Sequence, residues 1–198
     1  MKDVAHLVFL YNMKLITITG PSGAGKDTVA KMMSNMTDWP IVCSYTTRPR
    51  RFGEIDGEDH YFVDKCDVPR ENMLAYTQYG SYEYWTTVDQ IKGIAIYVID
   101  EAGLVDLKKH HPEITVYSIY VFSAAAARLT RGVKLLRILR DEERLNLGPD
   151  ISFDDRIYND FSKDLNELSF EVARCVCYMP FVKEHLDPYD LETPHFTD

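Results

Sequence analysis

Short apolar runs alternate along the chain with segments whose apolar residues recur at helical spacing. The runs begin near residues 14, 41, 94, 114 and 156. Between the first two runs, a spacing of three to four positions separates Val29, Met32, Met33 and Met36. This spacing is typical of a helix that buries one face. Strands that alternate with such helices predict an α/β fold, in which a parallel sheet is flanked by helices.

The first run leads directly into a glycine-rich loop. Gly20 and Gly25 bracket four residues and Lys26 follows, which gives the pattern G-x-x-x-x-G-K between a predicted strand and a predicted helix. In this pattern, backbone N–H groups and the helix N-terminus face phosphate oxygens, and the lysine adds a full positive charge. The sequence therefore predicts a P-loop NTPase-type fold that binds ATP. The predicted ATP-binding residues of this loop are Gly20, Ser22, Gly23, Ala24, Gly25, Lys26, Asp27 and Thr28.

One position departs from the usual form of this loop. Asp27 follows the lysine where serine or threonine is usual, and Thr28 keeps a hydroxyl group one position later. A carboxylate can ligate Mg²⁺ directly or through water, because this ion prefers oxygen. Asp100 ends the apolar run 94–99, at the carboxyl end of a predicted buried strand. We therefore predict Asp27, Thr28 and Asp100 as magnesium ligands, with helix capping as the alternative role for Asp100.

Composition and charge narrow the class of protein. With 198 residues and 45% hydrophobic content, the chain can form one sizeable core. No apolar run approaches the roughly 20 residues that a membrane-spanning helix needs, so no membrane partner is predicted. The net charge of -9 argues against broad nucleic-acid binding, which requires a basic face. The four cysteines show neither zinc spacing nor a C-x-x-C pair, which predicts reduced thiols in a cytoplasmic protein.

A second motif follows the strand predicted at 41–46. Its residues, in order, are Thr46-Thr47-Arg48-x-x-Arg51-x-x-Glu54-x-x-Gly57-x-x-His60-x-Phe62-Val63. This segment resembles the signature of guanylate kinases, which phosphorylate GMP. The resemblance implies that Arg48 and Arg51 bind the monophosphate of the acceptor and that Ser44 lies near its base. His60 stands where the family has a phosphate-contacting tyrosine, which places it at the substrate. Asp100 matches an aspartate of the family's strand end and is placed near Mg²⁺ or the acceptor base.

The chemistry of arginine agrees with this implication, because its planar fork of N–H donors matches phosphate oxygens. The alternative for the loop alone is a solvated basic segment that pairs with its own acids, which are Glu54, Asp56, Glu58 and Asp59. The phosphate loop about twenty residues upstream favours the phosphate site over this alternative.

The resemblance extends into a tyrosine-rich segment. Residues 80–86 look similar to the family's Gly-x-Tyr-Tyr-Gly-Ser/Thr, with one extra residue and Trp85 in place of a glycine. This similarity implies that Tyr84 binds phosphate and that Thr86 reads the base. Counted back from the turn glycine, the family's base-reading glutamate falls on Leu74, so that position does not secure specificity for guanine.

Basic residues recur at spacings of three and four in the order Arg131, Lys134, Arg137, Arg140 and Arg144. In the family this region is the lid, whose arginines fold over the transferring phosphoryl group. The resemblance implies Lys26, Arg131 and Arg140 as catalytic residues. Arg137 and Arg144 are close rivals for the second lid position. The alternative is a helix whose arginines pair with its own acids, which are Asp141, Glu142 and Glu143.

These assignments divide the chain into a leader or extension at 1–12, a guanylate kinase-like domain at 13–178 and an acidic tail at 179–198. The domain is predicted to contain an acceptor-binding insertion at about 48–88 and a lid at about 128–148. Asn159 matches the family's residue near the adenine of ATP.

The resemblance implies an enzyme that transfers a phosphoryl group from ATP, with Mg²⁺, to GMP or dGMP. The departures at Leu74, His60 and Val98 leave open a kinase for another nucleoside or deoxynucleoside monophosphate, or for a different phosphorylated small molecule. A second alternative is a catalytically inactive binding module of the same fold, and the intact Gly25-Lys26 pair argues against it. Small-molecule nucleotides are the predicted partners, and the sequence gives no indication of oligomeric state.

Overall fold

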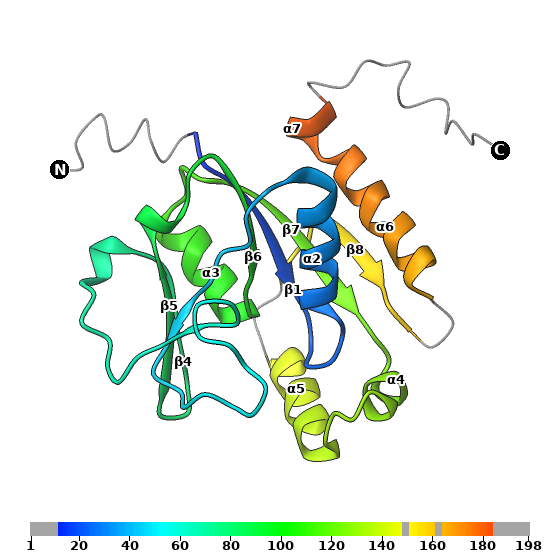
Figure 1. The fold of residues 1–198 in the computed structure, drawn as a ribbon, viewed down its shortest axis with the longest axis horizontal. Helices are drawn as coiled ribbons and strands as arrows, with labels where there is room; N and C mark the ends of the chain where they lie inside the picture. The colour runs from blue at the N-terminus through cyan, green and yellow to red at the C-terminus, as the bar shows by residue number, and fades with distance from the viewer. Residues whose placement is uncertain (1–11, 148–150, 161–163, 184–198) are drawn as a thin grey trace.

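The computed structural model describes residues 12–147, 151–160 and 164–183, which form two sheets with flanking helices (Figure 1). The main sheet has four strands. In order across the sheet they are β6 (Ile94–Val98), β1 (Lys14–Thr19), β7 (Thr115–Phe122) and β8 (Asp155–Tyr158). Every neighbouring pair in this sheet is parallel. The prediction of a parallel sheet flanked by helices is therefore confirmed.

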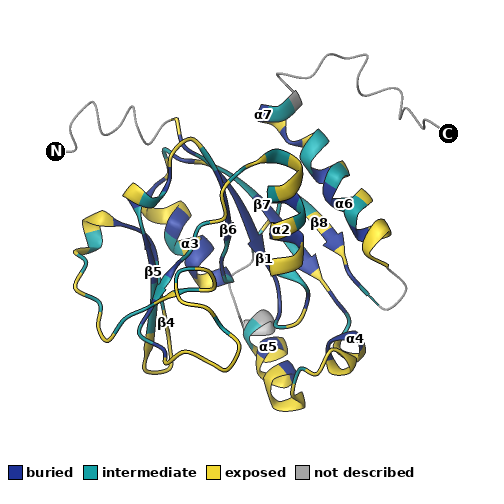
Figure 2. Cartoon of the chain, in the orientation of Figure 1, coloured by how far each residue is buried: buried dark blue, intermediate teal, exposed yellow. Residues whose placement is uncertain are grey.

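Both faces of the main sheet are covered, so its strands are apolar on both sides. The covering helices are α2 (Lys26–Thr37), α3 (Glu101–His110) and α6 (Leu165–Tyr178). Alternate residues of β1 point to opposite faces: Leu15 packs in the core beside α3, whereas Ile16 and Ile18 pack in the core beside α2 and α6. Figure 2 shows the result, with buried strands in dark blue and exposed outer helix faces in yellow.

A smaller sheet lies beside the main one and packs against α3. Its strands, in order, are β3 (Tyr61–Phe62), β2 (Tyr45–Thr46), β5 (Tyr82–Thr87) and β4 (Met73–Tyr79). Single 3₁₀ turns flank this hairpin at Arg70–Asn72 and Val88–Gln90. Stacked rings stabilise the sheet, because the ring of Tyr45 lies 4.8 Å from that of Tyr61 and 5.6 Å from that of Trp85. Two of the predicted acceptor-binding residues, Tyr84 and Thr86, lie on β5, and four more, Ser44, Arg48, Arg51 and His60, lie in the segments next to β2 and β3.

The strand predicted at 41–46 is wrong in extent. Ile41 forms only an isolated bridge with Ile96, and the strand itself is Tyr45–Thr46, which belongs to the smaller sheet. The backbone N–H and C=O of Ile96 both bond to the residues that flank Ile41. The segment therefore touches the edge of the main sheet briefly and then crosses to the second sheet, a change of partner that an apolar run does not reveal.

Two helices follow β7 at the carboxyl end of the main sheet, α4 (Ala125–Thr130) and α5 (Leu135–Leu147) (Figure 1). Most of the arginines predicted for the lid lie on α5, and Arg131 lies between the two helices. Among the described residues, no helix combines the length and the apolar character needed to cross a membrane.

The packed chain continues past residue 178. The short helix α7 (Pro180–Lys183) follows α6, and Met179 and Phe181 are buried in the core beside α2. The predicted start of the tail at 179 is therefore too early, because these two large apolar side chains complete that core. The predicted leader, apart from Asn12, and the tail from 184 onward lie outside the described residues.

Ile16 tests the core that supports the site, because it is fully buried in the central strand of the main sheet. We expect Ile16→Ala to lower the free energy of unfolding by about 3 kcal/mol, since the missing methylene and methyl groups leave a cavity. Urea unfolding measures this change. The control is Leu136→Ala on α5, where the side chain is 82% exposed, and its effect should stay within about 0.5 kcal/mol. Equal effects of the two variants would contradict the assigned packing.

Candidate functional site

The phosphate loop follows β1 and has glycines where its backbone requires them. Gly20 has a φ of 147°, and Gly25, the N-cap of α2, has a φ of 95°. A Cβ atom on Gly20 would lie 2.3 Å from the carbonyl oxygen of Val121, and one on Gly25 would lie 2.4 Å from the amide nitrogen of Asn159. That amide also donates to the carbonyl oxygen of Ala24 at 2.8 Å. The glycines therefore let the loop pack closely against the ends of β7 and β8.

Lys26 lies in the first turn of α2 and folds back over the loop. Its Nζ donates to the carbonyl oxygens of Gly20 at 2.9 Å and Pro21 at 3.1 Å. Burial lowers the pKa of the Lys26 amine, and the neighbouring Asp27 carboxylate acts in the opposite direction. Both hydrogen bonds go to neutral carbonyl groups, so the positive charge is available to an anion in the loop.

Helix α5 contacts the phosphate loop through Ser22. The backbone N–H of Ser22 donates to Oδ2 of Asp141 at 2.8 Å, and Nε of Arg137 donates to Oγ of Ser22 at 2.8 Å. Burial alone would raise the pKa of the Asp141 carboxyl group, but its hydrogen bonds with Ser22 lower it. An ionised carboxylate therefore binds an N–H group of the loop that the motif assigns to phosphate.

Arg48 lies in the loop after β2 and is fixed by Glu54. Its NH1 and NH2 donate to the two carboxylate oxygens of Glu54 at 2.9 Å and 2.8 Å. Glu54 also accepts from the backbone N–H of Arg51 at 2.7 Å, and its Oε1 lies 3.7 Å from NH1 of Arg51. Burial alone would raise the pKa of Glu54, but its hydrogen bonds with Arg48 and Arg51 lower it. One ionised carboxylate thus holds two arginines together.

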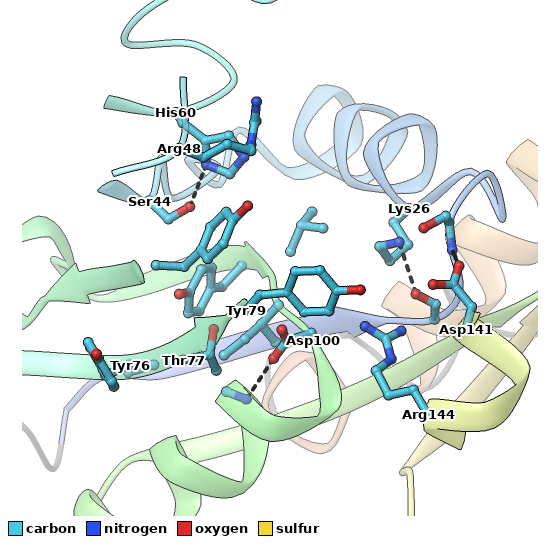
Figure 3. A pocket seen from close by; sticks show the side chains of 18 of the residues that line it. Lys26, Ser44, Arg48, His60, Tyr76, Thr77, Tyr79, Asp100, Asp141 and Arg144 are labelled. Atoms are coloured by element: carbon cyan, nitrogen blue, oxygen red, sulfur yellow. Dashed lines mark hydrogen bonds between the residues drawn. The ribbon is translucent and has the colours of Figure 1, made fainter. Parts of the chain in front are cut away.

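A single cavity joins the phosphate loop to these arginines (Figure 3). Lys26 and Asp141 lie on one side of it, and Arg48, Ser44 and His60 lie on the other. The predicted site residues that line it are Gly20, Ser22, Lys26, Ser44, Arg48, Arg51, His60, Tyr84, Asp100 and Arg140. Helix α5 adds the side chains of Arg137, Asp141 and Arg144. The described lining carries six cationic side chains, one lysine and five arginines, against two carboxylates, so it suits ligands that bear phosphate.

Arg131 lies apart from this cavity, although it was predicted to act together with Arg140. It lines a second hollow with Thr28 and Asn159. Its guanidinium donates to the carbonyl oxygens of Gly23 at 3.0 Å and Asn159 at 3.1 Å, and to Oδ1 of Asn159 at 3.1 Å. Arg131 therefore connects the phosphate loop to the end of β8 by hydrogen bonds, and one of its partners is Asn159, the residue predicted to lie near adenine.

The three predicted magnesium ligands do not share one cavity. Asp100 lines the main cavity, Thr28 lines the second hollow, and Asp27 is exposed in the first turn of α2. Among the described residues, no three His, Cys, Asp or Glu side chains form a metal-binding group. Oδ1 of Asp100 accepts from the backbone N–H of Gly103 at 2.8 Å, so Asp100 is the N-cap of α3. Its other oxygen still fits Mg²⁺, an ion that combines one or two carboxylates with phosphate oxygens and water.

The residues predicted to read the base lie differently from expectation. Thr86 is fully buried, and its hydroxyl donates to the phenol oxygen of Tyr97 at 3.1 Å, so Tyr97 and not Thr86 lines the cavity. Leu74 packs in the core beside α3, and the cavity wall on β4 is formed by Ala75, Tyr76, Thr77 and Tyr79. The pairing of β4 with β5 shifts register between Met73 and Ala75, so Leu74 lies at an irregularity of the strand, where its side chain is buried in the core.

Sequence reasoning missed several cavity residues, among them Asp141 and Tyr97. Asp141 follows Arg137 by four positions, so helical spacing places both on one face of α5. Nothing in that spacing shows that this face meets the phosphate loop. Tyr97 gave a usable signal, because a tyrosine inside an otherwise aliphatic strand needs a partner for its hydroxyl group.

The carboxylate of Asp141 should compete with phosphate for the Ser22 N–H. We expect Asp141→Asn to lower the Kd for ATP by about fivefold, because the neutral amide removes a negative charge from the helix N-terminal site. Titration calorimetry with ATP measures this. Glu143→Gln, at an exposed position of the same helix, is the matched control and should leave the Kd unchanged. An Asp141→Asn protein that binds ATP no better than wild type would contradict the competition.

Comparisons with known proteins agree with this geometry. The guanylate kinase family model matches residues 12–134. The guanylate kinase of Lactiplantibacillus plantarum is 43% identical over 84 residues, which are 39% of this chain and 41% of that protein. The guanylate kinase of Streptococcus mutans is 33% identical over 111 residues, which are 50% of this chain and 53% of that protein. The match therefore spans about half the length of these relatives.

A longer match is found with the guanylate kinase of Chlorobium luteolum, which is 28% identical over 175 residues, 78% of this chain and 87% of that protein. Among solved structures, the guanylate kinase from Anaplasma phagocytophilum has a TM-score of 0.54 at 23% identity, over 81% of this chain and 82% of that chain. At this identity the structural likeness supports the fold alone.

Proposed function

This chain belongs to the guanylate kinase family, and we propose that it transfers the γ-phosphoryl group of ATP to the phosphate of GMP or dGMP. The observation that carries the proposal is the single cavity lined by Lys26 of the phosphate loop and by Arg48 and Arg51. One cavity with a cationic group at each end can hold two phosphate-bearing ligands next to each other.

In the proposed reaction, an oxygen of the acceptor's phosphate attacks the γ-phosphorus, and the bond to the bridging oxygen breaks as ADP leaves. Two anions must approach each other, so positioning and charge neutralisation supply most of the catalysis. Lys26 holds the donor phosphates, and Arg48 and Arg51, fixed by Glu54, hold the acceptor phosphate. The attacking group is largely ionised at neutral pH, so the reaction needs no general base.

Three arginines of α5 line the cavity between the two ends, namely Arg137, Arg140 and Arg144. Their positions are supported by neighbours: the Arg140 guanidinium lies 4.8 Å from the ring centre of Tyr79, and Arg144 lies 3.1 Å from Glu101 at the start of α3. We propose that these three stabilise the charge of the transferring phosphoryl group, in place of Arg131.

The residues present also fit a magnesium ion. Asp100 would hold it through the carboxylate oxygen that does not cap α3, together with phosphate oxygens and water. When bound, the ion neutralises phosphate charge during transfer. Asp27 and Thr28, at the start of α2, remain predictions as further magnesium ligands near the phosphates of ATP. A cytoplasmic location and small-molecule nucleotides as the main partners are part of the same proposal.

One observation favours a second candidate, a kinase for another nucleoside monophosphate. The cavity wall on β4 is formed by Ala75, Tyr76, Thr77 and Tyr79, and β4 contains no acidic residue. A carboxylate accepts two N–H donors of a base at once, and a strand that offers only hydroxyl groups discriminates less between bases.

A coupled assay of ADP release tests both candidates. The protein is given Mg-ATP and, in turn, GMP, dGMP, IMP, AMP, dTMP, UMP and CMP. The proposal expects fastest turnover with GMP or dGMP, whereas fastest turnover with another acceptor moves the function to the second candidate. No turnover with any acceptor, and no change of thermal stability with ATP, would make the protein a binding module.

A further inference from the structure

The imidazole of His60 lies at the acceptor end of the main cavity, beside Arg48 and Ser44 (Figure 3). Its Nδ1 lies 2.8 Å from Oγ of Ser44. The edges of its ring meet Phe62 and Tyr84, with ring centroids 5.8 Å and 5.9 Å away. Ring contacts and a hydrogen bond therefore hold this titratable group in the cavity wall, next to the arginines that we assign to the acceptor phosphate.

The charges at this end of the cavity do not balance a phosphate group. Arg48 and Arg51 together carry two positive charges, but both contact the carboxylate of Glu54, which cancels one of them. A phosphate monoester above its second pKa carries about two negative charges. The Nε of Arg48 is buried and has no hydrogen-bond partner among the described residues, so the free charge at this end comes from the guanidinium pair with Arg51 alone. One further positive charge would complete the pairing.

Resting on the proposed function, we propose that His60 takes up a proton from solvent when the acceptor's phosphate binds and becomes the third cation of the acceptor site. Neutral imidazole and H⁺ give imidazolium, so each binding event by this route places one added proton on His60. Protonated His60 therefore strengthens binding of the acceptor's phosphate at lower pH. This contribution does not depend on which base the acceptor carries.

The groups around His60 agree with a ring that is neutral before binding. Burial lowers the pKa of His60, and the positive charge of Arg48 lowers it further, whereas the carboxylates of Glu54 and Asp59 raise it. The Tyr84 ring and the Ser44 hydroxyl also face the imidazole. A phosphate dianion placed against this set reverses the balance and raises the pKa of His60 in the complex.

The direction of the pH dependence follows from this difference. His60 has a higher pKa in the complex than in the free protein, so its contribution to affinity is complete below the free-protein pKa. The contribution is lost as the pH rises through the pKa of the complex. For a difference of one pKa unit the contribution is tenfold in affinity.

Calorimetry measures the proton directly. The acceptor that turns over fastest in the panel above is titrated into the protein at pH 7.5, in two buffers of different ionisation enthalpy. At this pH the free acceptor is almost entirely a dianion, so it releases few protons of its own. We expect the wild type to take up on the order of half a proton per acceptor. His60→Gln, whose amide can keep the hydrogen bond to Ser44, and His60→Tyr should take up none.

His110→Gln, at an exposed histidine near the end of α3, is the matched control and should behave as the wild type. A second readout is the ratio of kcat/KM for the acceptor between wild type and His60→Gln, which should fall about tenfold from pH 6 to pH 8.5. Acceptor binding without proton uptake, together with a flat ratio, would overturn this inference and leave the proposed function standing. A wild type that binds none of the acceptors would overturn both.

Discussion

Lys26→Met should lower kcat about a thousandfold while the protein stays folded. The ammonium group of Lys26 lies over the phosphate loop and is held there by two carbonyl oxygens. Methionine has nearly the same length and volume, so the variant removes the charge and little else. Without that charge, repulsion between the donor and acceptor phosphates is less compensated in the transition state.

The steady-state rate of ADP release, with saturating ATP and acceptor, measures this loss. Lys31→Met is the matched control, because Lys31 is an exposed lysine of the same helix, and its kcat should be within about twofold of wild type. Urea unfolding of both variants checks that the fold is intact. If Lys26→Met kept more than a tenth of the activity, the phosphate loop would not be the site of the chemistry.

Arg48→Ala should lower kcat/KM for the acceptor about a thousandfold, with little change in the Kd for ATP. Arg48 contributes a fork of donors at the acceptor end, and its removal leaves the carboxylate of Glu54 without its main partner. The uncompensated negative charge then faces the incoming phosphate. Arg48→Lys should recover only a small part of the loss, because a point charge cannot reproduce the bidentate geometry.

The double variant Arg48→Ala/Glu54→Ala separates the two causes. If repulsion by the freed carboxylate contributes, the double variant should be more active than Arg48→Ala alone. Arg50→Ala, at an exposed arginine of the same loop, is the control and should leave kcat/KM within about threefold of wild type. An equal loss of ATP affinity and acceptor activity in Arg48→Ala would contradict the assignment of Arg48 to one end of the cavity.

The sequence predicted the main sheet and the phosphate loop because both depend on local patterns. Runs such as 94–99 are apolar throughout, as strands buried on two faces must be, and the glycines of the loop stand where the backbone has positive φ. The strand at 41–46 was extended too far, because its apolar residues satisfy contacts with two different sheets. The spacing of apolar residues shows that a segment is buried, but it does not show which sheet or helix the segment packs against.

The site depended on contacts between distant segments, and these were only partly predictable. Arg48, Arg51 and Lys26 carry their chemistry in short motifs and line one cavity. Asp141 binds Ser22, 119 residues earlier in the chain, and no local pattern encodes such a contact. Arg131 lies at the expected place in sequence but faces the second hollow, because its guanidinium is taken by carbonyl groups of Gly23 and Asn159.

We propose that donor and acceptor phosphates meet in one cavity between Lys26 and Arg48. The most direct test is the affinity of a bisubstrate analogue in which five phosphates join adenosine to guanosine. We expect calorimetry to show one site that binds the analogue at least about a hundredfold more tightly than GMP or ATP alone, with ATP and GMP each competing for it. An analogue bound no more tightly than ATP alone, or displaced by only one of the two nucleotides, would contradict the claim.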